Sequence, residues 1–204
     1  MGSVIHAFGM RCLIFFIATG LCCCAPSNLL RVHYQLPPRS DELAGNQIFL
    51  SFKDAREKKT MLSESAREAL SDFSGNFTLV VGQDAGGEKL LGAYDLDSLL
   101  KEAFKQRIEH TGIQVSEKMQ LETQIEFVLK QFMLDLQDRK WILTMSYQTN
   151  LLKDGNVIIS ETISGSAERL KMSARRDAEK IIGELISDTI NKVNLSELFR
   201  EAGL

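Results

Sequence analysis

Apolar and polar residues alternate most regularly in the second half of the chain. The run 141–151 alternates strictly, and Trp141 and Tyr147 share its apolar face, which is the pattern of a strand with one buried side. The alternation resumes at 157–167, after an Asp154-Gly155 pair of the kind that forms a two-residue hairpin turn. These two segments are therefore predicted to be antiparallel neighbours.

The preceding segment, 121–136, fits two interpretations. Its apolar residues alternate in two opposite phases, which a bulge near Lys130 and Gln131 would join in one strand. At a period of 3.6 residues, apolar side chains of the same segment also line up on a helix. The strand is favoured because the strand at 141–151 needs a partner, which a hairpin through 137–140 would supply. Residues 121–168 are thus predicted to form a three-stranded meander.

Helical periodicity is strongest in two longer segments, 95–111 and 173–193. Each segment collects its apolar residues on one side of a helix, and Asp95 can cap the first one. Arg175 and Arg176 fall in the first turn of the second helix, where they oppose the helix dipole. The sequence offers no physical reason for this pair.

The remaining elements are short. They are predicted strands at 47–52, 77–81 and 113–115, a weaker helix at 63–73, a loop at 82–92 and an amphipathic tail at 195–201. Two amphipathic helices and a sheet with one apolar face predict an α+β fold. We expect a single two-layer domain with a mostly antiparallel sheet, a C-terminal three-stranded meander and two long helices packed on one face.

A short apolar segment, 13–21, follows Arg11 near the start of the chain and is followed by three consecutive cysteines. A membrane-spanning helix needs roughly 20 apolar residues, so this segment is too short to remain as a transmembrane anchor. Its layout is typical of a cleaved secretory signal. The sequence leaves open whether Met1 or Met10 is the true start.

The end of this signal resembles the lipobox of bacterial lipoproteins, in which a leucine lies three positions before the modified cysteine and a small residue directly precedes it. Leu21 and Cys23 give Cys24 this spacing. Cys22 and Cys23 fit the pattern less well and remain alternatives for the modified residue. An ordinary secretory signal and a cytoplasmic cluster of acylated cysteines are the other interpretations.

The resemblance implies cleavage before Cys24 and a diacyl- or triacylglyceryl anchor, in which palmitate is a typical chain. Several acyl chains hold a protein on a membrane much more firmly than one. Ala25 follows the anchor, in place of the aspartate that retains lipoproteins in the inner membrane of enteric bacteria. The resemblance therefore favours the outer membrane of a Gram-negative bacterium, with the protein facing the periplasm.

The cysteines agree with this interpretation, because Cys12, Cys22, Cys23 and Cys24 are the four cysteines of the chain. After cleavage one thiol would remain, and it would carry the lipid. Downstream of residue 24 the sequence thus excludes disulfides, cysteine metal sites and cysteine nucleophiles.

The chain is accordingly divided into three regions. The predicted boundaries are a cleaved signal at 1–23, a lipid anchor and tether at 24–45 and a single domain at 46–204. All three prolines, Pro26, Pro37 and Pro38, lie in the tether, where they favour an extended chain.

Charge and motifs argue against several classes of function. The net charge is −3 with both signs mixed along the chain, so a nucleic-acid partner is not expected. Gly86-Gly87-Glu88-Lys89 lacks the spacing of a phosphate-binding loop. His33 and His110 are isolated, and no metal site, cofactor site or catalytic motif is recognised. We therefore expect a protein that is not an enzyme and uses no cofactor.

Two pairs of residues are candidates for an interaction site. Asp54 and Arg56 lie at the end of the strand predicted at 47–52, where a structural ion pair is the ordinary role. Trp141 and Tyr147 are either core residues or the floor of a groove for a lipid or a protein. The structural role is favoured for both pairs.

The order of elements resembles the YajG family of bacterial lipoproteins. The matching features are the Cys24 anchor, the strand ending in Asp54-Ala55-Arg56, the segment 91–96 before the first long helix, Arg107 near its end and Gly112 behind it, then the meander and the last long helix. In layout the chain is also similar to auxiliary lipoproteins of lipid-transporting ABC systems. These resemblances imply a fold and an envelope location rather than a chemistry.

Three functions agree with these observations. The favoured one is a lipid-anchored cell-envelope lipoprotein that acts as a non-enzymatic periplasmic interaction module, with an envelope protein as partner. The second is an accessory subunit of an envelope lipid-transport system, which requires an apolar groove between sheet and helices. The third is an enzyme with an unrecognised site, which requires buried polar residues converging in a pocket.

Overall fold

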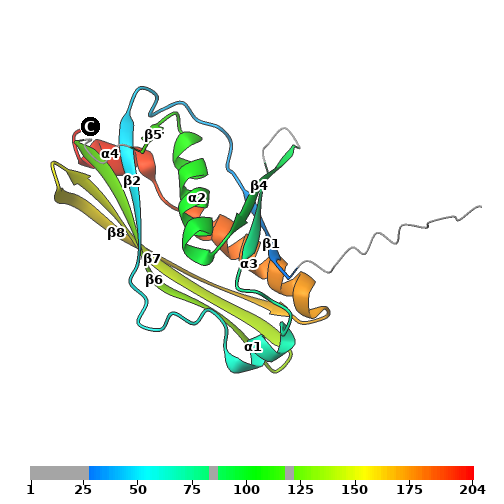
Figure 1. Ribbon diagram of the computed structural model, residues 1–204. Coiled ribbons are helices and arrows are strands. Elements are labelled where there is room, and N and C mark those ends of the chain that lie inside the picture. The colour runs from blue at the N-terminus through cyan, green and yellow to red at the C-terminus, as the bar shows by residue number, and fades with distance from the viewer. Residues whose placement is uncertain (1–27, 83–86, 118–121) are drawn as a thin grey trace, which may run out of the picture.

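The computed structural model describes residues 28–82, 87–117 and 122–204. The predicted signal and Cys24 lie outside these residues. Figure 1 shows the elements in chain order: β1 (Leu30–Gln35), β2 (Gln47–Asp54), α1 (Glu64–Ala69), β3 (Phe77–Gly82), β4 (Glu88–Tyr94), α2 (Leu96–Glu109), β5 (Gln114–Ser116), β6 (Thr123–Gln137), β7 (Lys140–Lys153), β8 (Asn156–Leu170), α3 (Ala174–Asn191) and α4 (Leu195–Glu201).

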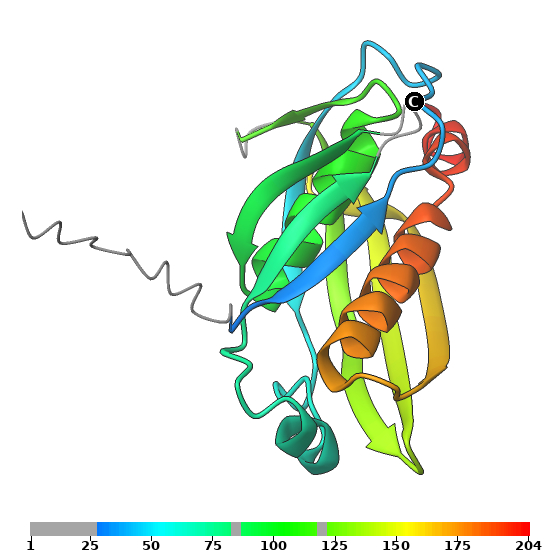
Figure 2. The same cartoon turned by 90° about the vertical axis from the view of Figure 1, so that its right-hand side faces the viewer.

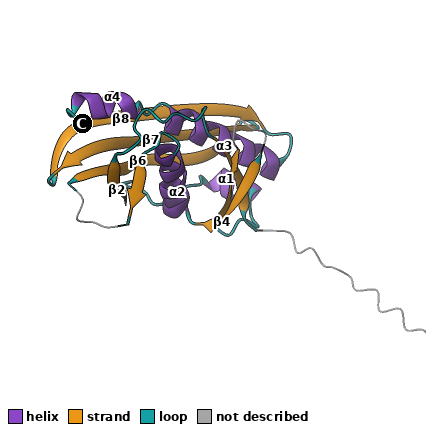
Figure 3. Ribbon diagram, turned by 90° about the horizontal axis from the view of Figure 1, so that it is seen from above, coloured by secondary structure: helices purple, strands orange, loops and turns teal. Residues whose placement is uncertain are grey.

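These strands form two sheets (Figure 3), with α2 packed between them and α3 lying beside β1 against the larger sheet. The larger sheet has the order β5-β2-β6-β7-β8, and the smaller one has the order β1-β3-β4. Strand β2 is parallel to β5 and β6, and β1 is parallel to β3, whereas β6, β7 and β8 are antiparallel. The predicted α+β class, the meander and the two long helices on one face of the sheet are confirmed. The hydrophobic pattern does not reveal that three strands form a separate sheet.

The meander has the bulge that its two phases of alternation predict. The register of β6 against β7 shifts between Leu129 and Gln131, so apolar residues on both sides of the bulge face the helices. The following turn uses Asp138 and Arg139 with φ angles of 46° and 64°, the left-handed conformation that suits a two-residue hairpin. The alternation of 141–151 thus buries Trp141 and the apolar residues in phase with it.

The first long helix is fixed by its cap and by aromatic packing. The Asp95 side chain accepts a hydrogen bond from the Ser98 backbone N–H at 2.8 Å, which satisfies one of the free donors at the helix start. The ring of Phe104 on α2 stacks on Phe127 of β6 with centroids 3.5 Å apart and meets Tyr147 edge-on. This cluster joins α2 to the centre of the larger sheet.

The second long helix lies beside β1 at the edge of the smaller sheet and packs on the larger sheet (Figure 2), and glycine permits close contact on both of these sides. A Cβ atom added at Gly183 of α3 would lie 2.6 Å from the backbone oxygen of His33 in β1. A Cβ atom at Gly165 of β8 would lie 2.5 Å from the Thr189 side chain of α3. Helix α3 therefore touches the backbone of one sheet and covers the inner face of the other.

Two predicted irregular segments contain strands. The predicted tether, 24–45, includes β1, in which Leu30, Val32 and Tyr34 are completely buried, so the prediction is wrong for that part. The nearby prolines suggested a spacer, although the same residues alternate as in a strand. The predicted loop at 82–92 likewise contains most of β4, whose side chains are mainly exposed and polar at its start.

Candidate functional site

Asp54 and Arg56 form a buried bidentate ion pair at the end of β2. The Nε and Nη2 atoms of Arg56 each lie 3.0 Å from a carboxylate oxygen of Asp54, and the Arg56 backbone N–H donates to the same carboxylate. The side chain of Arg56 is only 7% exposed and that of Asp54 only 11%. The more exposed Lys59 adds a third contact, with its Nζ 3.0 Å from Asp54 Oδ2.

Asp54, Arg56 and Lys59 together form what we call the Asp54 cluster. In this cluster the two cations shift the pKa of Asp54. Burial alone would raise the pKa of Asp54, but hydrogen bonds from Arg56 and Lys59 outweigh burial and hold the pKa well below its usual range. The pKa of Asp97, at the start of α2, is raised by burial and by the negative charge of Asp54. The arrangement keeps Asp54 ionised at neutral pH and therefore unsuited to act as a general acid.

The cluster also fixes the backbone at the bulge of β6. The Ala55 N–H donates to the Leu129 carbonyl at 2.8 Å, immediately before the bulge. A cavity of about 490 Å³ borders the bulge, and its charged lining consists of Arg56, Lys58, Lys130 and Glu57. The remaining guanidinium nitrogen of Arg56, Nη1, is buried and has no hydrogen-bond partner among the described residues. It has no exposed surface in the cavity, so the geometry favours a structural role.

Trp141 and Tyr147 lie in the closed core, each with a relative exposure of 0%. The Tyr147 hydroxyl donates to the Thr189 carbonyl of α3 at 2.7 Å, and burial raises the pKa of this hydroxyl far above its usual range. The Trp141 indole nitrogen is buried without a hydrogen-bond partner in the described part of the chain. A groove floor requires exposed side chains, so the structure agrees with core packing.

Arg107 of α2 is a polar feature whose surroundings the sequence does not reveal. It lies near the hydroxyls of Tyr34 and Tyr147, and burial lowers the pKa of its guanidinium. Among residues 28–82, 87–117 and 122–204, the buried Nε of Arg107 has no hydrogen-bond partner. The only feature of the sequence that singles out Arg107 is its match to the YajG pattern, near the end of the helix predicted at 95–111.

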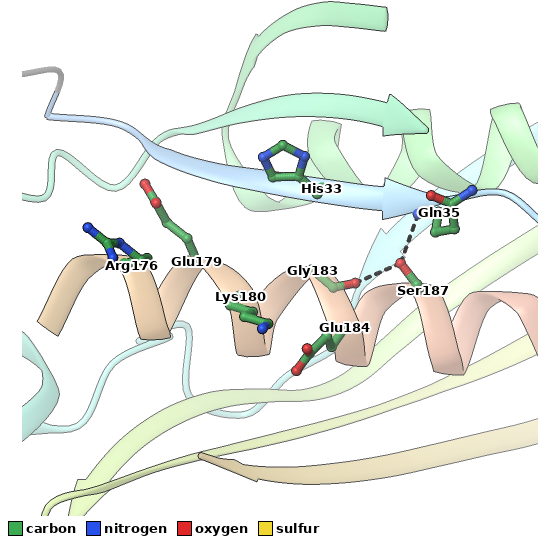
Figure 4. Close-up of a pocket in the computed structure, with 8 residues that line it drawn as sticks. All are labelled: His33, Gln35, Arg176, Glu179, Lys180, Gly183, Glu184 and Ser187. Carbon is green, nitrogen blue, oxygen red and sulfur yellow. Dashed lines mark hydrogen bonds between the residues drawn. The ribbon is translucent and has the colours of Figure 1, made fainter. Parts of the chain in front are cut away.

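A groove of about 580 Å³ runs between β1 and α3 (Figure 4). Its side chains close the edge of the smaller sheet, because Glu179 accepts the Arg31 backbone N–H at 2.9 Å and Ser187 accepts the Gln35 backbone N–H at 3.0 Å. Acidic and basic groups alternate along the groove. No nucleophile in it is paired with an oriented base, so it offers no recognisable catalytic arrangement.

The outer edge of the larger sheet is open. Strand β8 is 15 residues long, and in the described chain its backbone pairs with β7 on one side only. Val157 and Ile158 near its start are 54% and 46% exposed. A long edge strand with free backbone groups is a template for pairing with another chain.

The described residues contain neither a metal-ligand cluster nor a membrane-spanning helix. No group of three or more His, Cys, Asp or Glu residues is arranged to hold a metal ion in this part of the chain. None of the helices in these residues is both long enough and apolar enough to cross a membrane. Cys24, the predicted lipidation site, is outside the residues to which these findings apply.

Comparison with known proteins shows the fold. The structure is similar to the crystal structure of a DUF330 protein from Xanthomonas campestris, with a TM-score of 0.54 and 13% sequence identity over 86% of this chain and 99% of that chain. A minor lipoprotein from Acinetobacter baumannii gives a TM-score of 0.39 at 10% identity, covering 76% of this chain and 93% of the other. No family model and no curated protein matches the sequence. The chain therefore has the fold of the Xanthomonas protein.

Proposed function

We propose that the protein is a lipid-anchored cell-envelope lipoprotein that acts as a non-enzymatic interaction module facing the periplasm. The anchor is Cys24, and the location is the outer membrane, as the lipobox-like sequence and Ala25 suggest. The main observation in support of the interaction role is the open edge of β8.

The composition of β8 supports an edge that another strand can extend. Its 15 residues contain only three charged side chains, Glu161, Glu168 and Arg169, whereas isolated edge strands are commonly protected by charge or proline. An extended segment of a partner protein would add a strand by main-chain hydrogen bonds, and the alternate side chains would supply specificity. The partner in this proposal is an envelope protein.

The polar clusters support a non-enzymatic role. The charged groups of the Asp54 cluster are paired with one another. In the groove between β1 and α3, Glu179 and Ser187 accept hydrogen bonds from backbone N–H groups. Groups engaged in this way maintain the fold and are poorly placed to activate a substrate.

Site-specific photocrosslinking in cells tests both parts of the proposal. A photoreactive residue at Thr162 of β8 should yield one dominant protein adduct, and the same residue at the exposed Gln131 of β6 serves as the control position. Mass spectrometry of the purified protein should show acyl chains on Cys24. The Cys24→Ala variant should lose both the acyl mass and the adduct.

Each outcome bears on a different part of the proposal. Unmodified Cys24 would overturn the anchor, and equal adducts at Thr162 and Gln131 would overturn the role of the β8 edge. A transporter subunit as the captured protein would identify the lipid-transport alternative as the biological setting of the module.

A further inference from the structure

The chain enters the domain beside the start of α3. From Asn28 onward it is held in place, since the Ser74 backbone N–H donates to the Asn28 carbonyl at 2.9 Å. The guanidinium of Arg175 donates to the Leu29 carbonyl at 2.9 Å and pairs with Asp72 at 3.1 Å. Figure 1 shows this entry point next to the N-terminal end of α3.

The distance between this entry point and the predicted anchor is short. Asn28 follows Cys24 by four residues, which span at most about 14 Å when fully extended. If Cys24 is the anchor, as in the proposed function on which this inference rests, the domain cannot rotate freely above the membrane. The end of the domain around Asn28 must then lie at the bilayer surface.

That end carries a pair of exposed apolar side chains. Met172 is 86% exposed and Leu170 is 63% exposed, on either side of Lys171. Their backbone is fixed, because the Lys171 N–H donates to the Arg139 carbonyl at 2.8 Å and the Met172 N–H donates to Asp177 Oδ2 at 2.7 Å. A rigid loop thus presents two apolar side chains to the outside.

Three basic residues lie near these two apolar side chains. Arg139 in the β6–β7 turn and Arg176 in the first turn of α3 are exposed, and Lys171 is half-buried between them. The acidic neighbours are partly engaged, since Asp177 accepts backbone hydrogen bonds and Glu168 pairs with Lys140 at 3.4 Å. Apolar side chains flanked by basic ones suit the boundary between acyl chains and phosphate headgroups.

We propose that the loop Leu170–Met172, together with Arg139 and Arg176, is the membrane-facing surface of the domain. Leu170 and Met172 enter the headgroup region, and the cations contact lipid phosphates. This orientation gives a reason for the two arginines in the first turn of α3: Arg175 fixes the entering chain and Arg176 faces the bilayer. The apolar residues at the other end of β8, Val157 and Ile158, then lie far from the membrane.

The single thiol of residues 24–204 allows a test that is independent of lipidation in cells. This form retains every described element of the fold. Cys24 is coupled to a maleimide lipid in vesicles of phosphatidylethanolamine and phosphatidylglycerol, and to a soluble maleimide for comparison. Hydrogen exchange measured by mass spectrometry should slow by about an order of magnitude at 170–176 on vesicles alone, because a covered backbone opens less often to solvent.

Charge substitutions at the two ends of β8 complete the test. The Leu170→Glu/Met172→Glu variant should lose the protection, whereas Val157→Glu/Ile158→Glu should keep it. The control residues are comparably exposed and lie about 40 Å along the same strand from Leu170. Protection that is absent, occurs elsewhere or persists in the first variant overturns the orientation. An unmodified Cys24 in cells overturns the proposed function, while the vesicle assay decides the orientation by itself.

Discussion

Helix α3 contacts both sheets, but the edge strand β1 of the smaller sheet is covered and the edge strand β8 of the larger sheet is open. At β1 of the smaller sheet, Glu179 and Ser187 of the helix accept backbone N–H groups that a neighbouring strand would otherwise bind. At β8 of the larger sheet, the helix packs on the inner face near Gly165 and leaves the edge uncovered. One helix thus closes one edge and keeps the other available.

Because of this difference, the stability of the protein and its binding to a partner should depend on different residues. The contacts at the closed edge join distant parts of the chain, and the Asp54–Arg56 ion pair is buried, so the loss of either should lower the free energy of unfolding. Side chains on the open edge have few contacts to lose, so their replacement should alter binding and leave folding almost unchanged. Substitutions ordered by expected effect on stability test this separation.

The largest effect is expected inside the larger sheet, far from its open edge. Asp54→Ala leaves the guanidinium of Arg56 buried without its carboxylate, which typically costs about 3 kcal/mol. Urea unfolding followed by circular dichroism should show the corresponding fall in the midpoint. The control is Asp41→Ala, which removes a carboxylate from the exposed Arg39–Asp41 pair and should have little effect. Equal midpoints for the two variants would contradict the structural role of Asp54.

The same residue gives the protein a defined acid sensitivity. Because the folded-state pKa of Asp54 lies below its unfolded value, its contribution to stability is complete from about pH 5 upward, a unit above the unfolded value, and is lost as the pH falls through the folded pKa. The stability difference between the native protein and Asp54→Asn should therefore shrink between about pH 5 and pH 2. Unfolding curves at fixed ionic strength measure it, and a difference that does not change with pH would contradict the assigned pKa shift.

The second-largest effect on the free energy of unfolding is expected where α3 contacts β1. Gly183→Ala would place a Cβ atom 2.6 Å from the His33 carbonyl oxygen, and forced overpacking costs about 2 kcal/mol. In an exposed helix the same change stabilises by about 1 kcal/mol, so the sign of the effect distinguishes the two situations. Gly87→Ala is the control, because a Cβ atom there has no neighbour within 4 Å in the part of the chain that the structure describes. A stabilised Gly183→Ala would show that α3 is not in contact with β1.

The extent to which the sequence predicts this arrangement depends on the separation of the interacting residues. Local signals were sufficient for the Asp95 cap, the bulge after Leu129 and the Asp54–Arg56 pair, since each involves neighbours in sequence or a single strand pattern. The closed edge depends on contacts such as that of Ser187 with Gln35, 152 residues apart, which no periodicity reveals. The surroundings of Arg107 were missed for the same reason.

A third, smaller effect is expected from the hydrogen bonds of the closed edge. Ser187→Ala leaves the Gln35 backbone N–H without its acceptor, and the loss of one such bond costs about 1 kcal/mol. Lys180→Ala, on the same helix and beside the same groove, should cost less than half as much. Faster amide exchange at Gln35 in Ser187→Ala alone would locate the effect at the edge of β1. Unchanged exchange would show that the hydroxyl does not protect this strand.

The smallest effect on stability should accompany the largest effect on recognition. Thr162→Lys adds an exposed charge to the open edge, where lysine opposes the addition of a strand, and it should change the free energy of unfolding by less than about 0.5 kcal/mol. Capture of the partner should nevertheless fall about tenfold, which corresponds to about 1.4 kcal/mol of binding free energy. Gln131→Lys adds the same charge on β6, away from the edge, and should leave capture intact. If both lysines reduce capture equally, the partner contacts the outer face of the sheet, and the free backbone of β8 is not what it recognises.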